Sequence, residues 1–128
     1  MAVSKAAVEA VLVRGRLPCA RAFQVAERQG VTPSAVGKSA SRLGIKISRC
    51  QLGLFGYEDL GKRRILEPAD EVAHELKQAI DAQGEDGKIT CKSIWEIAAE
   101  LSIAKLHVAR AVEALGLKIT RCQLGCFR

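Results

Sequence analysis

The five cysteines are the residues of this sequence best suited to chemistry, because a thiolate can bind a metal ion or take part in redox exchange. Cys19 and Cys50 lie 31 residues apart, and Cys91 and Cys122 repeat this separation. Three interpretations stay open: buried thiols that pack as small apolar groups, a disulfide within each pair, or a redox or metal-sensing site made of Cys91, Cys122 and Cys126. We favour buried thiols, with the two members of each pair packed close together.

Other constellations that could do chemistry are missing from the sequence. The C-x3-C spacing of Cys122 and Cys126 differs from the C-x2-C of common zinc sites, and neither His74 nor His107 stands where it would complete four ligands. There is no glycine-rich phosphate loop, no HExxH pattern and no nucleophile paired with a base. We therefore expect no cofactor, no metal ligand set and no enzymatic activity.

The equal cysteine spacing belongs to a longer internal repeat. Residues 15–55 return as residues 87–127 at a constant offset of 72, without a gap. The first copy ends IKISRCQLGLF and the second ends LKITRCQLGCF. Such a repeat indicates one structural unit built twice. Because a unit of roughly 60 residues is near the lower limit for an independent core, we expect the copies to pack together with approximate two-fold symmetry.

Composition and charge narrow the class of partner. Residues 1–64 contain 12 Lys/Arg and 4 Asp/Glu, a balance of +8, whereas residues 65–128 contain 8 and 10, a balance of −2. The basic first half favours a polyanionic partner, most simply nucleic acid. With 48% apolar but only 4% aromatic residues, the core must consist mainly of small aliphatic side chains, which favours closely packed helices.

Local signals in the first copy predict helix, short strand, helix, turn, helix and β-hairpin. Ser4 can cap a helix that runs to about Arg14, and residues 20–29 form a second helix that ends at Gly30. Thr32 followed by proline predicts the start of a third helix, which runs to about Leu43. Alternating apolar residues then predict a strand over 45–50, and a turn over 51–53 returns the chain as a hairpin.

The second copy repeats this order. We expect its first helix to begin at Pro68 with acidic residues in its early turns, followed by a short strand over 88–91. Two further helices over 92–101 and 104–115 precede the second hairpin. The predicted domains are residues 1–56, a linker over 57–67 with the basic run Lys62 to Arg64, and residues 68–128.

The order of elements, with the pattern VAERQGVTPSAV, resembles the winged helix-turn-helix family of DNA-binding proteins. Ala26 and Ala98 are small where two helices would cross, and Gly30 stands at the turn, although Ser102 takes the glycine place in the second copy. The resemblance covers about 110 residues and implies two such units in tandem, a mainly α fold with small β-hairpins. It also implies that the third helix of each unit enters the major groove while the hairpin touches phosphates or the minor groove.

Carried onto this sequence, the resemblance implies a set of DNA-binding residues on the two third helices and the two hairpins. In the first copy these are Ser34, Lys38, Ser41, Arg42, Lys46, Arg49 and Gln51, and in the second they are Lys105, His107, Arg110, Lys118, Arg121 and Gln123. The alternative for the same residues is a set of solvent-exposed faces without a partner.

The predicted function is therefore double-stranded DNA binding by a transcriptional regulator that uses an intrachain pseudo-dimer. Two alternatives remain: a protein-interaction or assembly module, favoured by the acidic second copy and Glu113, and an RNA-binding protein. A homo-oligomer or a protein partner would bind through the second repeat. No stretch is long and apolar enough for a membrane span, and Glu9 interrupts the apolar N-terminal stretch, so we expect a cytoplasmic protein without a signal peptide.

Overall fold

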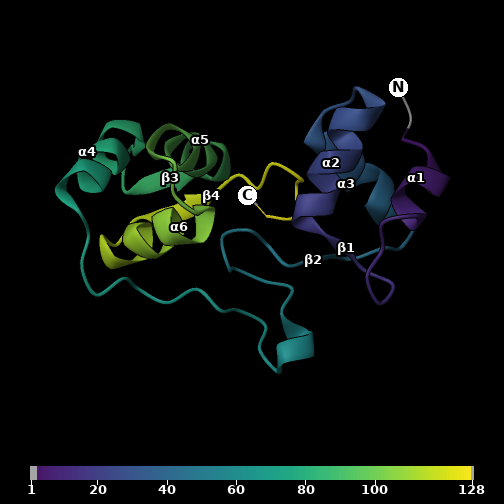
Figure 1. Ribbon diagram of the computed structural model, residues 1–128, viewed down its shortest axis with the longest axis horizontal. Helices are drawn as coiled ribbons and strands as arrows, with labels where there is room; N and C mark the ends of the chain where they lie inside the picture. The colour runs from purple at the N-terminus through teal and green to yellow at the C-terminus, as the bar shows by residue number, and fades with distance from the viewer. Residues whose placement is uncertain (1–2, 128) are drawn as a thin grey trace.

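The computed structural model describes residues 3–127 and is mainly helical (Figure 1). The first copy contains α1 (Lys5–Glu9), β1 (Leu17–Pro18), α2 (Cys19–Gln29), α3 (Pro33–Arg42) and β2 (Ile47–Ser48). The second contains α4 (His74–Gln83), β3 (Lys88–Thr90), α5 (Cys91–Leu101), α6 (Lys105–Ala114) and β4 (Lys118–Thr120). A short 3-10 helix, η1 (Glu58–Leu60), lies between them. None of the described helices is long and apolar enough to cross a membrane.

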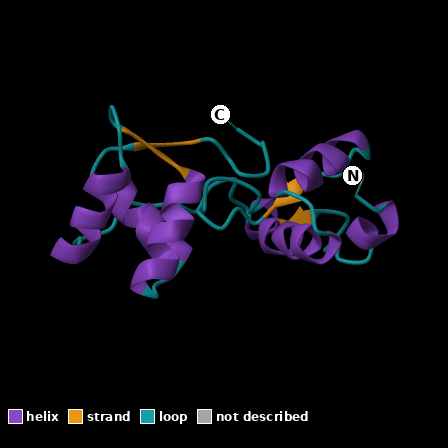
Figure 2. Ribbon diagram, turned by 90° about the horizontal axis from the view of Figure 1, so that it is seen from above, coloured by secondary structure: helices purple, strands orange, loops and turns teal. Residues whose placement is uncertain are grey.

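The predicted order of helix, short strand, helix and helix is present in each copy. The side chain of Thr32 accepts a hydrogen bond from the Ala35 N–H and caps α3, which begins with proline. α2 packs on α3, and α5 packs on α6 in the same way. Figure 2 shows the two helical groups at opposite ends of the molecule, with loops between them.

The predicted β-hairpins are wrong. β2 pairs with β1, and β4 with β3, as parallel two-stranded sheets, and the chain after each turn forms no described strand. In the first copy, two backbone hydrogen bonds join the chain before the turn to the chain after it. They run from Arg49 N–H to Gly56 O and from Cys50 N–H to Phe55 O. The reason is that Arg49 and its counterpart Arg121 adopt left-handed backbone conformations, with φ of 52° and 53°, which end each strand before an antiparallel ladder can extend.

Two predicted helix boundaries are also wrong. α1 ends at Glu9 rather than near Arg14, because the chain reverses at residues 14–15 and forms a bridge between Val13 and Arg16. The equivalent chain reversal in the second copy forms a bridge between Glu85 and Lys88. α4 begins at His74 rather than at Pro68, because the preceding segment is held extended along α6 through a bond from Ala69 N–H to Arg110 O.

Each of the two hydrophobic cores contains a leucine that comes from the other copy. Leu52, from the first copy, is fully buried in the core formed by α4, α5 and α6. Its repeat equivalent Leu124 is buried in the core formed by α1, α2 and α3. In Figure 1 the C-terminal segment leaves β4 and reaches the α2–α3 side of the molecule. Each copy therefore completes the core of the other.

Two aromatic pairs link equivalent positions of the repeat. The rings of Phe23 and Trp95 stack with centroids 4.1 Å apart, and those of Phe55 and Phe127 meet edge to face at 6.4 Å. A residue contacts its own equivalent where the two copies are related by a local two-fold axis. The contacts thus support the expected two-fold packing, and they place Phe23 and Trp95 at the junction of the copies rather than inside one core.

Candidate nucleic-acid interface

The outer face of α3 presents four of the residues predicted to bind DNA. Val36 and Ala40 are fully buried and anchor the inner face. The opposite side carries exposed residues spaced by one or two helical turns: Ser34, Lys38, Ser41 and Arg42. α3 contains two cations and no carboxylate, so this face is a positive surface with short side chains around its charges.

The turn between α2 and α3 has the same backbone geometry as the turn between α5 and α6. Gly30 ends α2 in the left-handed conformation with φ of 64°, and Ser102 adopts φ of 55° at the equivalent place. The following N–H groups of Val31 and Ile103 each bond to a carbonyl of the preceding helix at 3.0 Å. The turn geometry is therefore kept although one copy lacks the glycine.

The corresponding face of α6 is more covered. The ammonium of Lys105 lies 4.4 Å from the centre of the Trp95 ring, and Arg110 donates from Nε to the backbone oxygen of Glu67. Glu113 forms an ion pair with Arg64. His107 remains exposed. Residues 64–69 thus contact α6, whereas on α3 the backbone of Leu124 packs at Gly37 and leaves Ser34, Lys38, Ser41 and Arg42 exposed.

The strand and turn residues divide into exposed and engaged side chains. Lys46, Lys118 and Arg121 are exposed and available to a phosphate backbone. Gln51 is half-buried, and the Gln123 amide nitrogen lies 3.5 Å from the Cys91 sulfur.

Arg49 is held by two neighbours that the sequence pattern does not reveal. Its guanidinium pairs with Asp59 and lies 5.2 Å from the centre of the Tyr57 ring. Glu58 pairs in the same way with Arg16 at 3.0 Å. The sequence signal for these pairs was two acidic residues directly after the basic first copy, a pattern that does not reveal which cations they meet.

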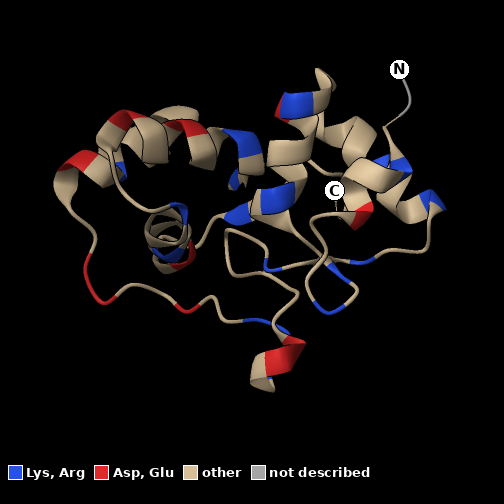
Figure 3. Cartoon of the chain, turned by 45° about the vertical axis from the view of Figure 1, so that its right-hand side comes forward, with Lys and Arg blue, Asp and Glu red and all other residues tan. Residues whose placement is uncertain are grey.

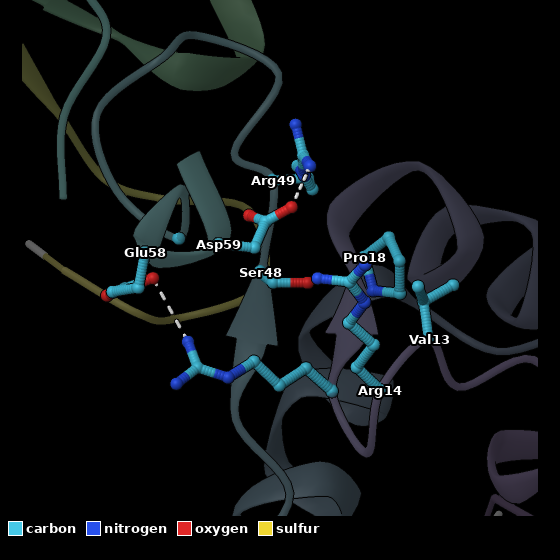
Figure 4. Close-up of a pocket in the computed structure, with 9 residues that line it drawn as sticks. Val13, Arg14, Pro18, Ser48, Arg49, Glu58 and Asp59 are labelled. Atoms are coloured by element: carbon cyan, nitrogen blue, oxygen red, sulfur yellow. Dashed lines mark hydrogen bonds and ion pairs between the residues drawn. The ribbon is translucent and has the colours of Figure 1, made fainter. Parts of the chain in front are cut away.

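A pocket of about 460 Å³ opens beside β1 and β2, next to these ion pairs (Figure 4). Its rim contains Arg14, Arg16 and Arg49, of which the last two pair with Glu58 and Asp59. The carboxylates offset most of the positive charge there, so the pocket is a weaker anion site than the face of α3.

The charge asymmetry of the sequence reappears in space. In Figure 3 the helices of the second copy carry acidic and basic residues together and η1 is acidic, while the helices of the first copy carry mainly Lys and Arg. Lys38 and Arg42 take part in no ion pair among residues 3–127. A negatively charged ligand is therefore attracted most strongly to the first copy.

All five cysteines are free thiols, and Cys19, Cys50 and Cys91 are buried as expected. Burial raises the pKa of the Cys19 thiol to about 12 and also raises the pKa of Cys50 and of Cys91. Cys122 is half-buried, and a hydrogen bond from the thiol of exposed Cys126 lowers its pKa to about 6 while raising that of Cys126. The alternative of a disulfide is not realised in either pair.

The cysteines divide between the two cores. Cys50 lies in the core that contains Cys91, and Cys122 packs against the core that contains Cys19. No group of three or more metal-ligating side chains in the described residues could hold a metal ion, and this includes Cys91, Cys122 and Cys126.

Comparison of this chain with family models, with curated proteins and with solved structures gives no match.

Proposed function

We propose that this protein binds double-stranded DNA through the helix-turn-helix unit of its first copy, with α3 in the major groove, and that it acts as a transcriptional regulator. The observation that carries the proposal is the exposed positive face of α3, which follows a tight turn after α2. Its residues are Ser34, Lys38, Ser41 and Arg42.

The shape of α3 suits the major groove. The short side chains of Ser34 and Ser41 let the helix backbone approach base edges closely, and their hydroxyls can donate or accept hydrogen bonds there. Lys38 and Arg42 lie on the same side and can reach a guanine edge or a phosphate. Such a face can therefore supply both affinity and sequence readout.

The contacts outside the groove come from the strand ends rather than from a β-hairpin. Lys46 precedes β2 and Lys118 begins β4, and both are exposed. We place each unit in the winged helix-turn-helix class with the wing reduced to the tight turn around residues 50–53 or 122–125. Phosphate contacts by these lysines would position the protein without reading sequence.

The second copy acts mainly as a structural partner in this proposal. Its Leu124 completes the core beneath α3, while its own α6 is partly covered by residues 64–69. The exposed His107, Lys118 and Arg121 give it a weaker second contact with DNA. The intrachain pseudo-dimer would thus bind asymmetrically.

A competition titration tests this function. A fluorescently labelled random duplex DNA is titrated with the protein at low salt, and duplex RNA of the same length competes for binding. We expect saturable binding to the DNA and displacement by RNA only at a concentration at least about tenfold higher, since the deep, narrow major groove of A-form RNA excludes a helix. Preferential binding to RNA would support the RNA-binding alternative. Absence of binding to either would favour a protein-interaction module.

A further inference from the structure

A hollow of about 800 Å³ lies where segments of both copies meet. The first copy contributes Leu54 and Phe55 to it, the second copy Ile119 and Phe127, and the segment between the copies Arg63 and Arg64. A smaller hollow of about 390 Å³ shares Leu54, Arg64 and Ile119 with the larger one. The two hollows therefore form one continuous groove, called the junction groove below. None of its lining residues belongs to α3.

Two aromatic rings line the junction groove. Phe55 and Phe127 occupy equivalent places in the repeat, and their rings meet edge to face with centroids 6.4 Å apart. Both side chains are half-buried, so part of each stays open to the groove. The backbone oxygen of Phe55 accepts from Cys50 N–H at 3.2 Å, and that of Phe127 accepts from Cys122 N–H at 3.0 Å. These bonds fix the two rings in place, which makes them a platform for a flat apolar group.

The rim of the junction groove is positively charged. Its five cations are Arg16, Lys46, Arg63, Arg64 and Lys118. The two carboxylates on the rim, Glu58 and Glu113, are already paired with Arg16 and Arg64, each at 3.0 Å. Lys46, Arg63 and Lys118 are exposed and take part in no ion pair among residues 3–127. Three positive charges thus remain without a partner, and they favour an anionic occupant.

An aromatic floor beneath a cationic rim suits a single-stranded nucleic acid. Unpaired bases present flat faces that stack on aromatic rings, while the phosphates follow a line of cations. A double helix does not offer these faces, because its bases stack on one another. A small anion fits less well, because sites for small ligands enclose most of the ligand surface, whereas four of the five cations on this rim are exposed. An acidic peptide would satisfy the cations but supplies no series of flat groups for the rings.

We propose that the junction groove binds a short segment of single-stranded nucleic acid, with bases against Phe55 and Phe127 and phosphates at Lys46, Arg63 and Lys118. This site is separate from the face of α3, so it does not depend on whether α3 binds duplex DNA. Lys46 and Lys118 also belong to the contacts proposed for the duplex. The variants that test the groove therefore leave both lysines in place.

Fluorescence anisotropy of the full-length protein with two labelled probes tests the site. One probe is a thymidine oligonucleotide eight residues long, and the other has the same length and phosphates but no bases. We expect the thymidine probe to bind at least about fivefold more tightly, because only its bases can stack on the rings. Its log–log salt slope should be about −2, which corresponds to three phosphate contacts on a single strand. Equal affinity for the two probes, or equally effective displacement by a glutamate peptide of the same length, would overturn the proposal.

Variants locate the binding in the junction groove. Phe55→Leu, with helix content checked by circular dichroism, should weaken binding of the thymidine probe by about fivefold and leave binding of the abasic probe unchanged. Arg63→Ala should weaken binding of both probes and make the salt slope shallower by about 0.7. Lys62→Ala is the matched control, because Lys62 is an exposed neighbour that lines neither hollow, and it should have a smaller effect.

Duplex DNA, titrated in parallel, separates this site from the one on α3, since Phe55→Leu should leave duplex affinity unchanged. Unchanged affinity of folded Phe55→Leu for the thymidine probe, or equal losses in Arg63→Ala and Lys62→Ala, would contradict the assignment. If Phe55→Leu does not fold, the comparison of the two probes on the wild-type protein decides.

Discussion

The rings of Phe23 and Trp95, which occupy the same place in the two copies, stack on each other at 4.1 Å with 27° between their planes. This contact joins α2 to α5 at the junction of the copies. An offset aromatic stack contributes about 0.5–1.5 kcal/mol beyond the burial of its area. A double-mutant cycle with Phe23→Ala and Trp95→Ala should therefore show a coupling free energy of that size in urea unfolding. A double-mutant cycle of Phe23→Ala with Leu60→Ala serves as the control and should show no coupling free energy.

The exchange of leucines between the cores gives a second prediction. Leu124→Ala and Leu52→Ala should each lower the free energy of unfolding by about 2–5 kcal/mol, because each removes a fully packed side chain from the core of the other copy. Leu60, which is 58% exposed, is the matched control, and Leu60→Ala should change stability by less than about 0.5 kcal/mol. Unchanged stability in both core variants, measured by urea denaturation, would show that the exchange does not occur in solution.

Gly37 in the middle of α3 supplies a third prediction. Alanine normally stabilises a helix interior relative to glycine by about 1 kcal/mol. Here a Cβ on Gly37 would lie 1.8 Å from the backbone oxygen of Leu124, so Gly37→Ala should instead destabilise the protein or displace the C-terminal segment. Ser41→Ala, on the exposed face of the same helix, should slightly raise the melting temperature. A stabilised Gly37→Ala variant would contradict the position of Leu124.

The turn before α6 gives a fourth prediction. Ser102 adopts the left-handed conformation that Gly30 adopts in the first copy, and a residue with a Cβ pays a steric cost there. Ser102→Gly should therefore raise the free energy of unfolding by about 0.5–1 kcal/mol. Ser39→Gly, inside α3, is the control and should lower it by about the same amount. A destabilised Ser102→Gly variant would indicate a different turn.

The sequence predicts much of the helical framework because its signals are local. The repeat, the Thr32–Pro33 helix start and the glycine at residue 30 locate α2 and α3, and the structure contains both helices. The start of α4 was misplaced because Pro68 and the acidic residues after it are also compatible with an extended segment. Contact of that segment with Arg110 decides between the two, and this contact is not local.

The strands and the cysteines show where local reasoning fails. Alternation at Ile45 and Ile47 predicts a strand but does not identify its partner, and the chain pairs it in parallel with β1. Cys50 lies in the core that contains Cys91, and Cys122 packs against the core that contains Cys19, an arrangement that the equal spacing in the sequence cannot show. The exposure of Lys38 and Arg42 was predictable from helical periodicity, whereas the covering of α6 was not.

DNA binding by the first copy is the central claim, and a salt titration of matched variants tests it most directly. The variants are Lys38→Ala/Arg42→Ala on α3, Lys105→Ala/Arg110→Ala on α6, and the control Lys77→Ala/Lys92→Ala on α4 and α5, each of which removes two positive charges. Affinity for duplex DNA is measured at several salt concentrations for each.

For the wild-type protein we expect a log–log slope of about −4 or steeper, which corresponds to four or more phosphate contacts. The α3 variant should lose about 1–3 kcal/mol of binding free energy per base-contacting side chain and show a shallower slope, while the α6 variant and the control should lose less. Equal losses of binding free energy in the three variants would show that the effect depends on net charge and not on the position of the charges. No binding by the wild-type protein at low salt, or a greater loss from α6 than from α3, would contradict the proposed function of the first copy.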